Sequence, residues 1–258
     1  METTTETLSN LARQLKLTGL SPVIGDLILT AGQKQMSYVD FTMDLLSAEI
    51  DHRNIQNLAK RLRHAKLPAQ HDLNLWQENH VNGISRTQLS HLRECIWLEQ
   101  HFNIILMGPS GVGKTFLGAG LCFDALQKGY RACFRTMEQL THLLKMKDIV
   151  KSMAREFEVL LHADLLVIDD IMMFPIERKQ AVSLFNLIDH LHQNASIIVT
   201  TNKSPDEWVK VLDDEVLAAA ILDRLLFKCE IVKLSGKSFR LENRKTILKK
   251  PFFKMLYL

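Results

Sequence analysis

The stretch Gly108-Pro109-Ser110-Gly111-Val112-Gly113-Lys114-Thr115 decides the fold of this chain. It matches the phosphate-binding loop G-x-x-x-x-G-K-[ST], and Phe116 follows it directly. The apolar run at 103–107 predicts a buried strand before the loop, and 116–128 predicts a helix that Gly129 ends. The loop glycines let the backbone approach a phosphate, and the N–H groups at the helix start point at the anion. We therefore expect nucleoside triphosphate binding by Gly108 to Phe116, with Lys114 on the outer phosphates and Thr115 on Mg²⁺.

Strand and helix patterns alternate after this loop. The pattern predicts a parallel sheet covered by helices, which is an α/β fold. The predicted strands are 131–136, 165–168 and 196–200, and the predicted helices are 138–145, 151–161 and 178–193. A further helix is predicted before the loop, at 85–99, where Ser85 and Gln88 form a capping-box pattern.

Polar residues follow two of these strands at the edge of the sheet where ligands bind. We expect Asp169 to hold Mg²⁺ and Asp170 to polarise the attacking water, with an acidic turn as the alternative. Asn202 can contact the γ-phosphate or that water, or it can belong to a turn leading to Ser204-Pro205. A GTPase carries N-K-x-D, whereas here the acid, Asp206, comes one position too late, so ATP is the expected nucleotide.

Composition sets wide limits. The chain has 258 residues, 47% hydrophobic and 24% charged, with a net charge of +3, so nucleic-acid binding is permitted but not required. The four cysteines are scattered, which argues against a zinc site or a disulfide framework. The polar N-terminus does not resemble a signal peptide, and no apolar run approaches the ~20 residues that span a bilayer. We expect a cytoplasmic protein that does not contact a membrane.

The first part of the chain reads as helical. We expect a helical N-terminal domain at 1–68, a linker at 69–84, the nucleotide domain at 85–248 and a tail at 249–258. A long helix is predicted from about Ser37 to Lys66, before Pro68. Its later half carries cations that either form a solvated face or contact DNA phosphates: Arg53, Lys60, Arg61 and Arg63.

A second basic group lies inside the nucleotide domain. It comprises Lys145, Lys147, Lys151 and Arg155. If the chain is helical from Lys147 onward, the last three residues are spaced by four and share one face. This face is a candidate DNA contact, with a solvated surface as the alternative.

The motifs together resemble a known family. The order G-P-S-G-V-G-K-T, L-L-V-I-D-D, V-T-T-N-K-S-P-D-E-W, L-D-R-L and G-K-S-F-R-L is similar to the AAA+ ATPases of the IstB type, which IS21-family insertion sequences encode. The resemblance covers most of the chain, including the N-terminal helical part. It implies an AAA+ core in which Asn202 is sensor 1, Arg224 is an arginine finger acting in trans and Arg240 is a sensor-2-like arginine.

The resemblance also implies partners. Members of this family bind duplex DNA, form ATP-dependent homo-oligomers on it and stimulate a partner transposase. The related helicase loaders act instead on a replicative helicase, which is the alternative function. A small-molecule P-loop kinase is a third, weaker one. The chain departs from a full AAA+ module because fewer than twenty residues follow Arg240, too few for a helical lid. From the residues alone, a surface pair between Asp223 and Arg224 remains an alternative to the trans role.

Overall fold

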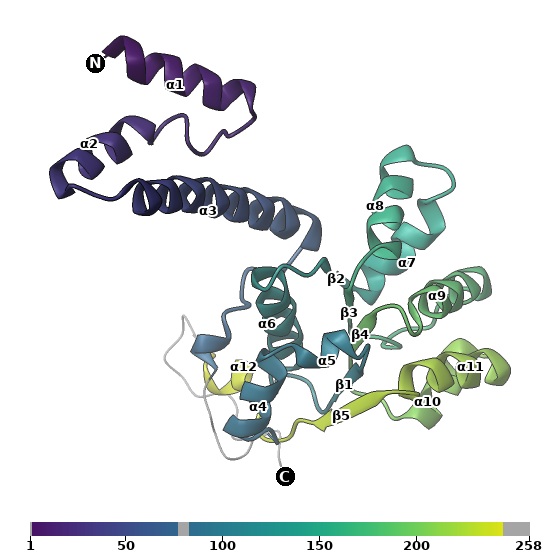
Figure 1. Ribbon diagram of the computed structural model, residues 1–258. Coiled ribbons are helices and arrows are strands. Elements are labelled where there is room, and N and C mark those ends of the chain that lie inside the picture. Colours follow the sequence, from purple (N-terminus) through teal and green to yellow (C-terminus); the bar gives the residue numbers. More distant parts are fainter. Residues whose placement is uncertain (1, 77–82, 245–258) are drawn as a thin grey trace. The chain divides into compact units, whose positions relative to one another are not determined.

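The computed structural model describes residues 2–76 and 83–244. The chain divides into two compact units, Met1–Arg63 and His64–Leu258 (Figure 1). The predicted tail at 249–258 and residues 77–82 of the predicted linker lie outside the described residues. No helix in the described part has the length and apolar character needed to cross a membrane.

The first unit is helical. It contains α1 (Glu2–Gln14), α2 (Ile24–Lys34) and most of α3 (Tyr38–Ala65). Glu49 of α3 is buried and accepts hydrogen bonds from the N–H groups of Gly19 (2.8 Å) and Leu20 (3.2 Å). A Cβ on Gly19 would collide with His52, so glycine lets the α1–α2 loop lie directly on α3. Helix α3 begins after Ser37, as the sequence predicts, and the Ser37 hydroxyl accepts a hydrogen bond from the N–H of Asp40 at 3.1 Å.

The second unit is built on a parallel sheet of five strands in the order β2-β3-β4-β1-β5. Every apolar run predicted as a strand forms one. The strands are β1 (Asn103–Met107), β2 (Ala132–Thr136), β3 (Leu165–Asp169), β4 (Ser196–Thr201) and β5 (Cys229–Lys233).

Helices cover both faces of this sheet (Figure 1). On one face α6 (Lys114–Gln127) packs against the sheet, together with α4 (Arg86–Arg93), α5 (Ile96–Glu99) and the short helix η1 (Leu73–Leu75). The other face carries α7 (Met137–Met146), α8 (Lys151–Leu161), α9 (Arg178–Leu191), α10 (Pro205–Leu212) and α11 (Glu215–Leu226). A buried core joins this second layer to Ile105, Leu166 and Val199 of the strands. The last described helix, α12 (Phe239–Glu242), lies beside the phosphate-binding loop.

One predicted helix and one conditional expectation differ in the structure. The helix expected across 85–99 breaks at Cys95, whose φ of 59° is left-handed, and so forms α4 and α5. The helices predicted at 138–145 and 151–161 are present as α7 and α8, but the chain turns through Ile149 and Val150 between them, so Lys147 is not part of α8. The prediction that Lys147 shares a helix face with Lys151 and Arg155 is therefore wrong.

Candidate functional site

The phosphate-binding loop connects β1 to α6, as the sequence predicts. Gly113 precedes the helix with a φ of 101°, a left-handed conformation that favours glycine. Lys114 is buried, and its Nζ donates to the carbonyls of Gly108 and Pro109, both at 2.8 Å. Burial lowers the pKa of Lys114, while the charges of Asp170 and Asp169 raise it. The ammonium therefore lies inside the loop, where phosphate oxygens can replace the two carbonyls as its partners.

Asp169 is the last residue of β3 and is only 4% exposed. The hydroxyl of Thr200, on the neighbouring strand β4, donates to its Oδ1 at 2.6 Å. Burial raises the pKa of Asp169, and the nearby charge of Asp170 adds to the rise. Hydrogen bonds from Thr200 and Thr115 and the charge of Lys114 oppose it. A buried carboxylate that shares a hydrogen bond with the Thr115 hydroxyl fits the two protein ligands expected for Mg²⁺.

Other metal chemistry finds no support in the described residues. No three His, Cys, Asp or Glu side chains there are grouped so that they could hold a metal ion. Most ligands of a Mg²⁺ at Thr115 and Asp169 would thus have to be phosphate oxygens and water, as is usual for this ion.

Asp170 follows with a left-handed φ of 55°, and its N–H donates to the Thr200 hydroxyl at 2.8 Å. Thr200 thus holds both aspartates through one hydroxyl. Sequence reasoning did not single out Thr200, although its position at the end of an apolar strand, beside the strand of the acidic pair, was a usable signal.

A cavity of ≈ 570 Å³ opens over the loop. Asp170 faces it from the end of β3, Lys114 from the start of α6, and Phe239 and Arg240 from α12. The lining also includes residues that the sequence did not indicate: Pro68, Gln70, His71, Asp72, Leu75, Trp76, Met173 and Lys237. Its polar loop and apolar walls are what a nucleotide with a phosphate tail and an aromatic base needs.

The predicted linker supplies one wall of this cavity. Trp76 stacks on Phe116, with ring centroids 6.0 Å apart, and a Cβ on Gly113 would lie 3.0 Å from its ring. Leu73 of η1 approaches α6 so closely that a Cβ on Gly120 would collide with it. Residues 68–76 are therefore packed on the nucleotide domain. An aromatic residue within the turn-rich stretch was the only sequence signal for this.

The residues after β5 close the opposite side. The N–H of Phe239 donates to the carbonyl of Gly111 at 3.0 Å, and Arg240 is near enough to Lys114 for its charge to lower the lysine pKa. Arg240 thus lines the cavity.

Sequence comparison decides the family. A sequence model of the family described as IstB-like ATP binding protein matches residues 10–247. A Bacteroides fragilis protein described as an ATP-binding protein of an IS21-like insertion sequence is 41% identical over 92% of this chain and 90% of its own length. The ATP-binding protein of IS21 from Pseudomonas aeruginosa is 32% identical over the same shares. This chain belongs to the IstB-like ATP-binding protein family.

Solved structures agree on the fold of this IstB-like chain. The replication initiator DnaA bound to AMPPCP and single-stranded DNA superposes with a TM-score of 0.56 at 17% identity, covering 67% of this chain and 52% of that one. The DnaC helicase loader superposes with a TM-score of 0.53 at 18% identity, covering 65% of this chain and 98% of that one. With the family and the loop, this likeness identifies the chain as a P-loop ATPase with an AAA+ core.

Arg224 of this IstB-like chain lies away from its own cavity. Its backbone carbonyl is 3.4 Å from Nδ2 of Asn103, the first residue of β1, whereas the phosphate-binding loop follows the last. A strand of that length separates its first and last residues by about 13 Å. The guanidinium pairs with Asp189 at 2.6 Å and lies 4.5 Å from the centre of the Phe185 ring. The ion pair is therefore with Asp189 of α9, not with the adjacent Asp223.

Asn202 directly follows β4, and its side chain is exposed. It does not line the cavity. The alternative to a sensor role, a turn leading to Ser204-Pro205, is present: Ser204 is the N-cap residue of α10 and forms a capping box with Glu207. Asn202 as sensor 1 stays a prediction.

The basic candidates differ in their partners. Arg53 pairs with Glu49 at 2.7 Å, Lys145 with Glu177 at 3.2 Å and Lys147 with Asp148 at 3.0 Å. Lys151 and Arg155 are exposed and lie one turn apart on α8. The remaining candidates, Lys60, Arg61 and Arg63, belong to α3.

Proposed function

We propose that this chain is a DNA-binding ATPase that helps transposition. Bound ATP joins neighbouring copies on duplex DNA, and the assembly selects and remodels a target site for the partner transposase. The observation that carries the proposal is the separation of Arg224 from its own nucleotide cavity. Arg224 lies beside the amino-terminal end of β1, whereas the cavity lies at the carboxyl ends of the strands. An arginine held there can complete only a neighbour's site, which requires a head-to-tail assembly. Activity on bacterial DNA would place the protein in the cytoplasm.

Each residue then has a defined task in hydrolysis. Lys114 and the loop N–H groups bind the outer phosphates. Asp170 orients a water and accepts its proton as the oxygen attacks the γ-phosphorus and the bond to the bridging oxygen of ADP breaks. Arg224 of the neighbour neutralises the charge that spreads over the γ-phosphoryl oxygens. Mg²⁺, held through Thr115 and Asp169, supplies further neutralisation when bound.

The DNA contacts come from exposed cations. Lys151 and Arg155 on α8 are our first candidates because no ion pair within the described residues occupies them. Arg53, Lys60, Arg61 and Arg63 of α3 are the second group. The relatives named for IS21 and IS21-like insertion sequences support a transposase as the partner of this chain.

A helicase loader is the second candidate, favoured by the likeness of the fold to the DnaC helicase loader. That likeness shows the fold alone. Stable binding to a replicative helicase, with no effect on a transposase, would favour it. A small-molecule kinase would instead phosphorylate an acceptor without DNA.

Electron microscopy of the full chain with an ATP analogue and duplex DNA tests the proposal. We expect a closed or arc-shaped assembly with bent DNA for the wild type. Lys114→Ala, which removes the phosphate-binding ammonium, should leave single subunits. Single wild-type subunits on DNA with every nucleotide would contradict the proposal.

A further inference from the structure

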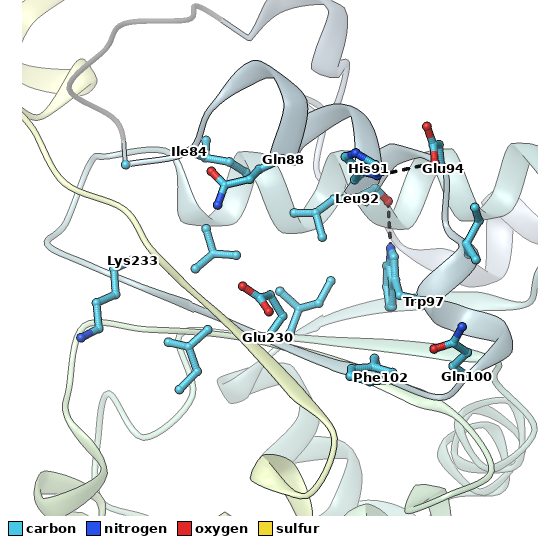
Figure 2. A pocket seen from close by; sticks show the side chains of 15 residues that line it. Ile84, Gln88, His91, Leu92, Glu94, Trp97, Gln100, Phe102, Glu230 and Lys233 are labelled. Carbon is cyan, nitrogen blue, oxygen red and sulfur yellow. Dashed lines mark hydrogen bonds and ion pairs between the residues drawn. The ribbon is translucent and has the colours of Figure 1, made fainter.

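A second cavity, of ≈ 660 Å³, lies between the α4–α5 pair and β5 (Figure 2). Its apolar lining includes Ile84, Leu92, Trp97, Ile104 and Val232, and none of its residues lines the nucleotide cavity. We call it the β5 groove. It needs an explanation of its own, because the ATPase chemistry does not use it.

One side of the groove is a free sheet edge. β5 ends the sheet, with β1 as its only partner among the described strands. Bonds from the Asn103 N–H to the Lys228 carbonyl and from the Leu234 N–H to the Met107 carbonyl, both 2.7 Å, bracket the strand. Because backbone groups alternate in direction along a parallel strand, the N–H and C=O of Ile231 point away from the sheet. Its side chain is also 43% exposed. Such an edge is a template for another strand.

The opposite wall of the groove, formed by α4 and α5, is held in place by its own hydrogen bonds and ion pair. The indole N–H of Trp97 donates to the Leu92 carbonyl at 2.8 Å, which fixes the ring across the break between α4 and α5. Arg93 pairs with Asp124 of α6 at 2.8 Å and so holds α4 on the domain. An occupant therefore would not have to order this wall on binding, which lowers the cost of association.

The charge of the groove selects its occupant. Figure 2 shows the Glu230 carboxylate within the groove, between Lys233 and Trp97. No hydrogen bond or ion pair of this carboxylate is found in the described part of the chain. A carboxylate among apolar residues and an indole suits a Lys or Arg side chain with an apolar stem.

We propose that the β5 groove binds an extended segment of the partner transposase, which adds to β5 as a further strand. In this segment a basic residue and apolar residues stand two positions apart, so that their side chains face the groove together. A Lys or Arg reaches Glu230, and apolar side chains pack against Leu92 and Trp97. Main-chain hydrogen bonds to Ile231 supply affinity, and the side-chain contacts supply specificity. The identity of the partner rests on the proposed function, whereas the shape and charge of the groove do not.

Variants of the full chain test this inference. Glu230→Lys reverses the charge in the groove, and Ile231→Pro removes the outward N–H, a change that an edge strand tolerates. Glu99→Lys is the matched control, because Glu99 lies on α5 but outside the groove. For each variant we would measure ATP hydrolysis, assembly on DNA, binding to the purified transposase and stimulation of strand transfer.

We expect Glu230→Lys and Ile231→Pro to bind the transposase at least about tenfold more weakly. Hydrolysis, assembly on DNA and the Glu99→Lys control should match the wild type. Full stimulation of the transposase by both groove variants would overturn the proposal for the β5 groove and leave the proposed function intact. An equal loss in Glu99→Lys would also overturn it. A wild-type chain with no effect on the transposase would overturn both proposals.

Discussion

Thr200 shows how one hydroxyl organises the acidic end of the site. It donates to Asp169 at 2.6 Å and accepts from the N–H of Asp170 at 2.8 Å. Thr200→Val removes both bonds at nearly constant volume. We expect ATP hydrolysis to fall about tenfold to a hundredfold, since general-base alignment is commonly worth that much. Affinity for ATP should change little, because Lys114 and the loop bind the phosphates. Thr200→Ser, which keeps the hydroxyl, should restore hydrolysis; equal rates in all three proteins would exclude this role.

Asp169 should lower the stability of the fold while serving catalysis. Its folded-state pKa is raised by burial, so the folded chain binds the proton more tightly than the unfolded chain. Stability therefore rises as the pH falls through the folded pKa and is lowest where Asp169 is ionised. We expect Asp169→Asn to stop hydrolysis and to increase the free energy of unfolding at neutral pH, because the amide carries no charge that burial penalises.

Thermal unfolding from pH 7 down to pH 5 checks this expectation. The melting temperature of Asp169→Asn should exceed that of the wild type, and the gap should shrink as the pH falls. Asp206→Asn, at an exposed position, is the control and should show no gap. A lower melting temperature for Asp169→Asn at neutral pH would contradict the assignment.

At the scale of elements, Arg135 joins β2 to the end of α3. Its side chain is 1% exposed and donates to the carbonyls of Ala65 (2.9 Å) and His64 (3.2 Å) and to Glu156 (2.9 Å), which also pairs with Lys66. Arg135→Ala leaves the partly buried carboxylate of Glu156 and the helix carbonyls without this partner. We expect a loss of about 3–5 kcal/mol in the free energy of unfolding, measured with denaturant. Arg131→Ala, whose ion pair with Asp164 is exposed, should cost about 1 kcal/mol or less.

Helix α8 should contribute most of the DNA binding of the ATPase domain. We expect the double variant Lys151→Ala, Arg155→Ala to weaken binding to any duplex and to reduce the slope of log affinity against log salt by about 2. Lys145→Ala should change the slope less, because Lys145 pairs with Glu177. Fluorescence anisotropy over a salt series measures both. An unchanged slope in the double variant would assign the contact elsewhere.

The same scale shows what sequence reasoning reaches. The loop, the strands and the acidic pair were predictable because each depends on residues that are close in the sequence: apolar runs for the strands, and glycine or acidic residues directly after them. The contacts of Trp76 with Phe116 and of Phe239 with Gly111 were not, since each joins segments far apart in the chain. The break at Cys95 was missed as well, because cysteine is an uncommon residue in a left-handed conformation and no glycine or proline marks the position.

At the scale of the whole molecule, the proposal depends on the nucleotide being shared between copies. Lys114, Asp170 and Arg240 of one chain line the same cavity, but Arg224 lies beside the amino-terminal end of β1, away from that cavity. Asp189 and Phe185 hold that guanidinium in place before any partner arrives. Under the proposal, one chain carries two halves of a catalytic site that it cannot join by itself.

Mixing two inactive variants tests this most directly. Lys114→Ala lacks the phosphate-binding ammonium, and Arg224→Ala lacks the arginine supplied to the neighbour. Alone on duplex DNA, each should hydrolyse ATP at less than about 1% of the wild-type rate. Mixed in equal amounts, and shown by light scattering to assemble together, they should recover up to about a quarter of that rate, since one head-to-tail interface in four pairs the intact halves. Wild-type hydrolysis by Arg224→Ala alone, or a co-assembled mixture without activity, would contradict the shared site.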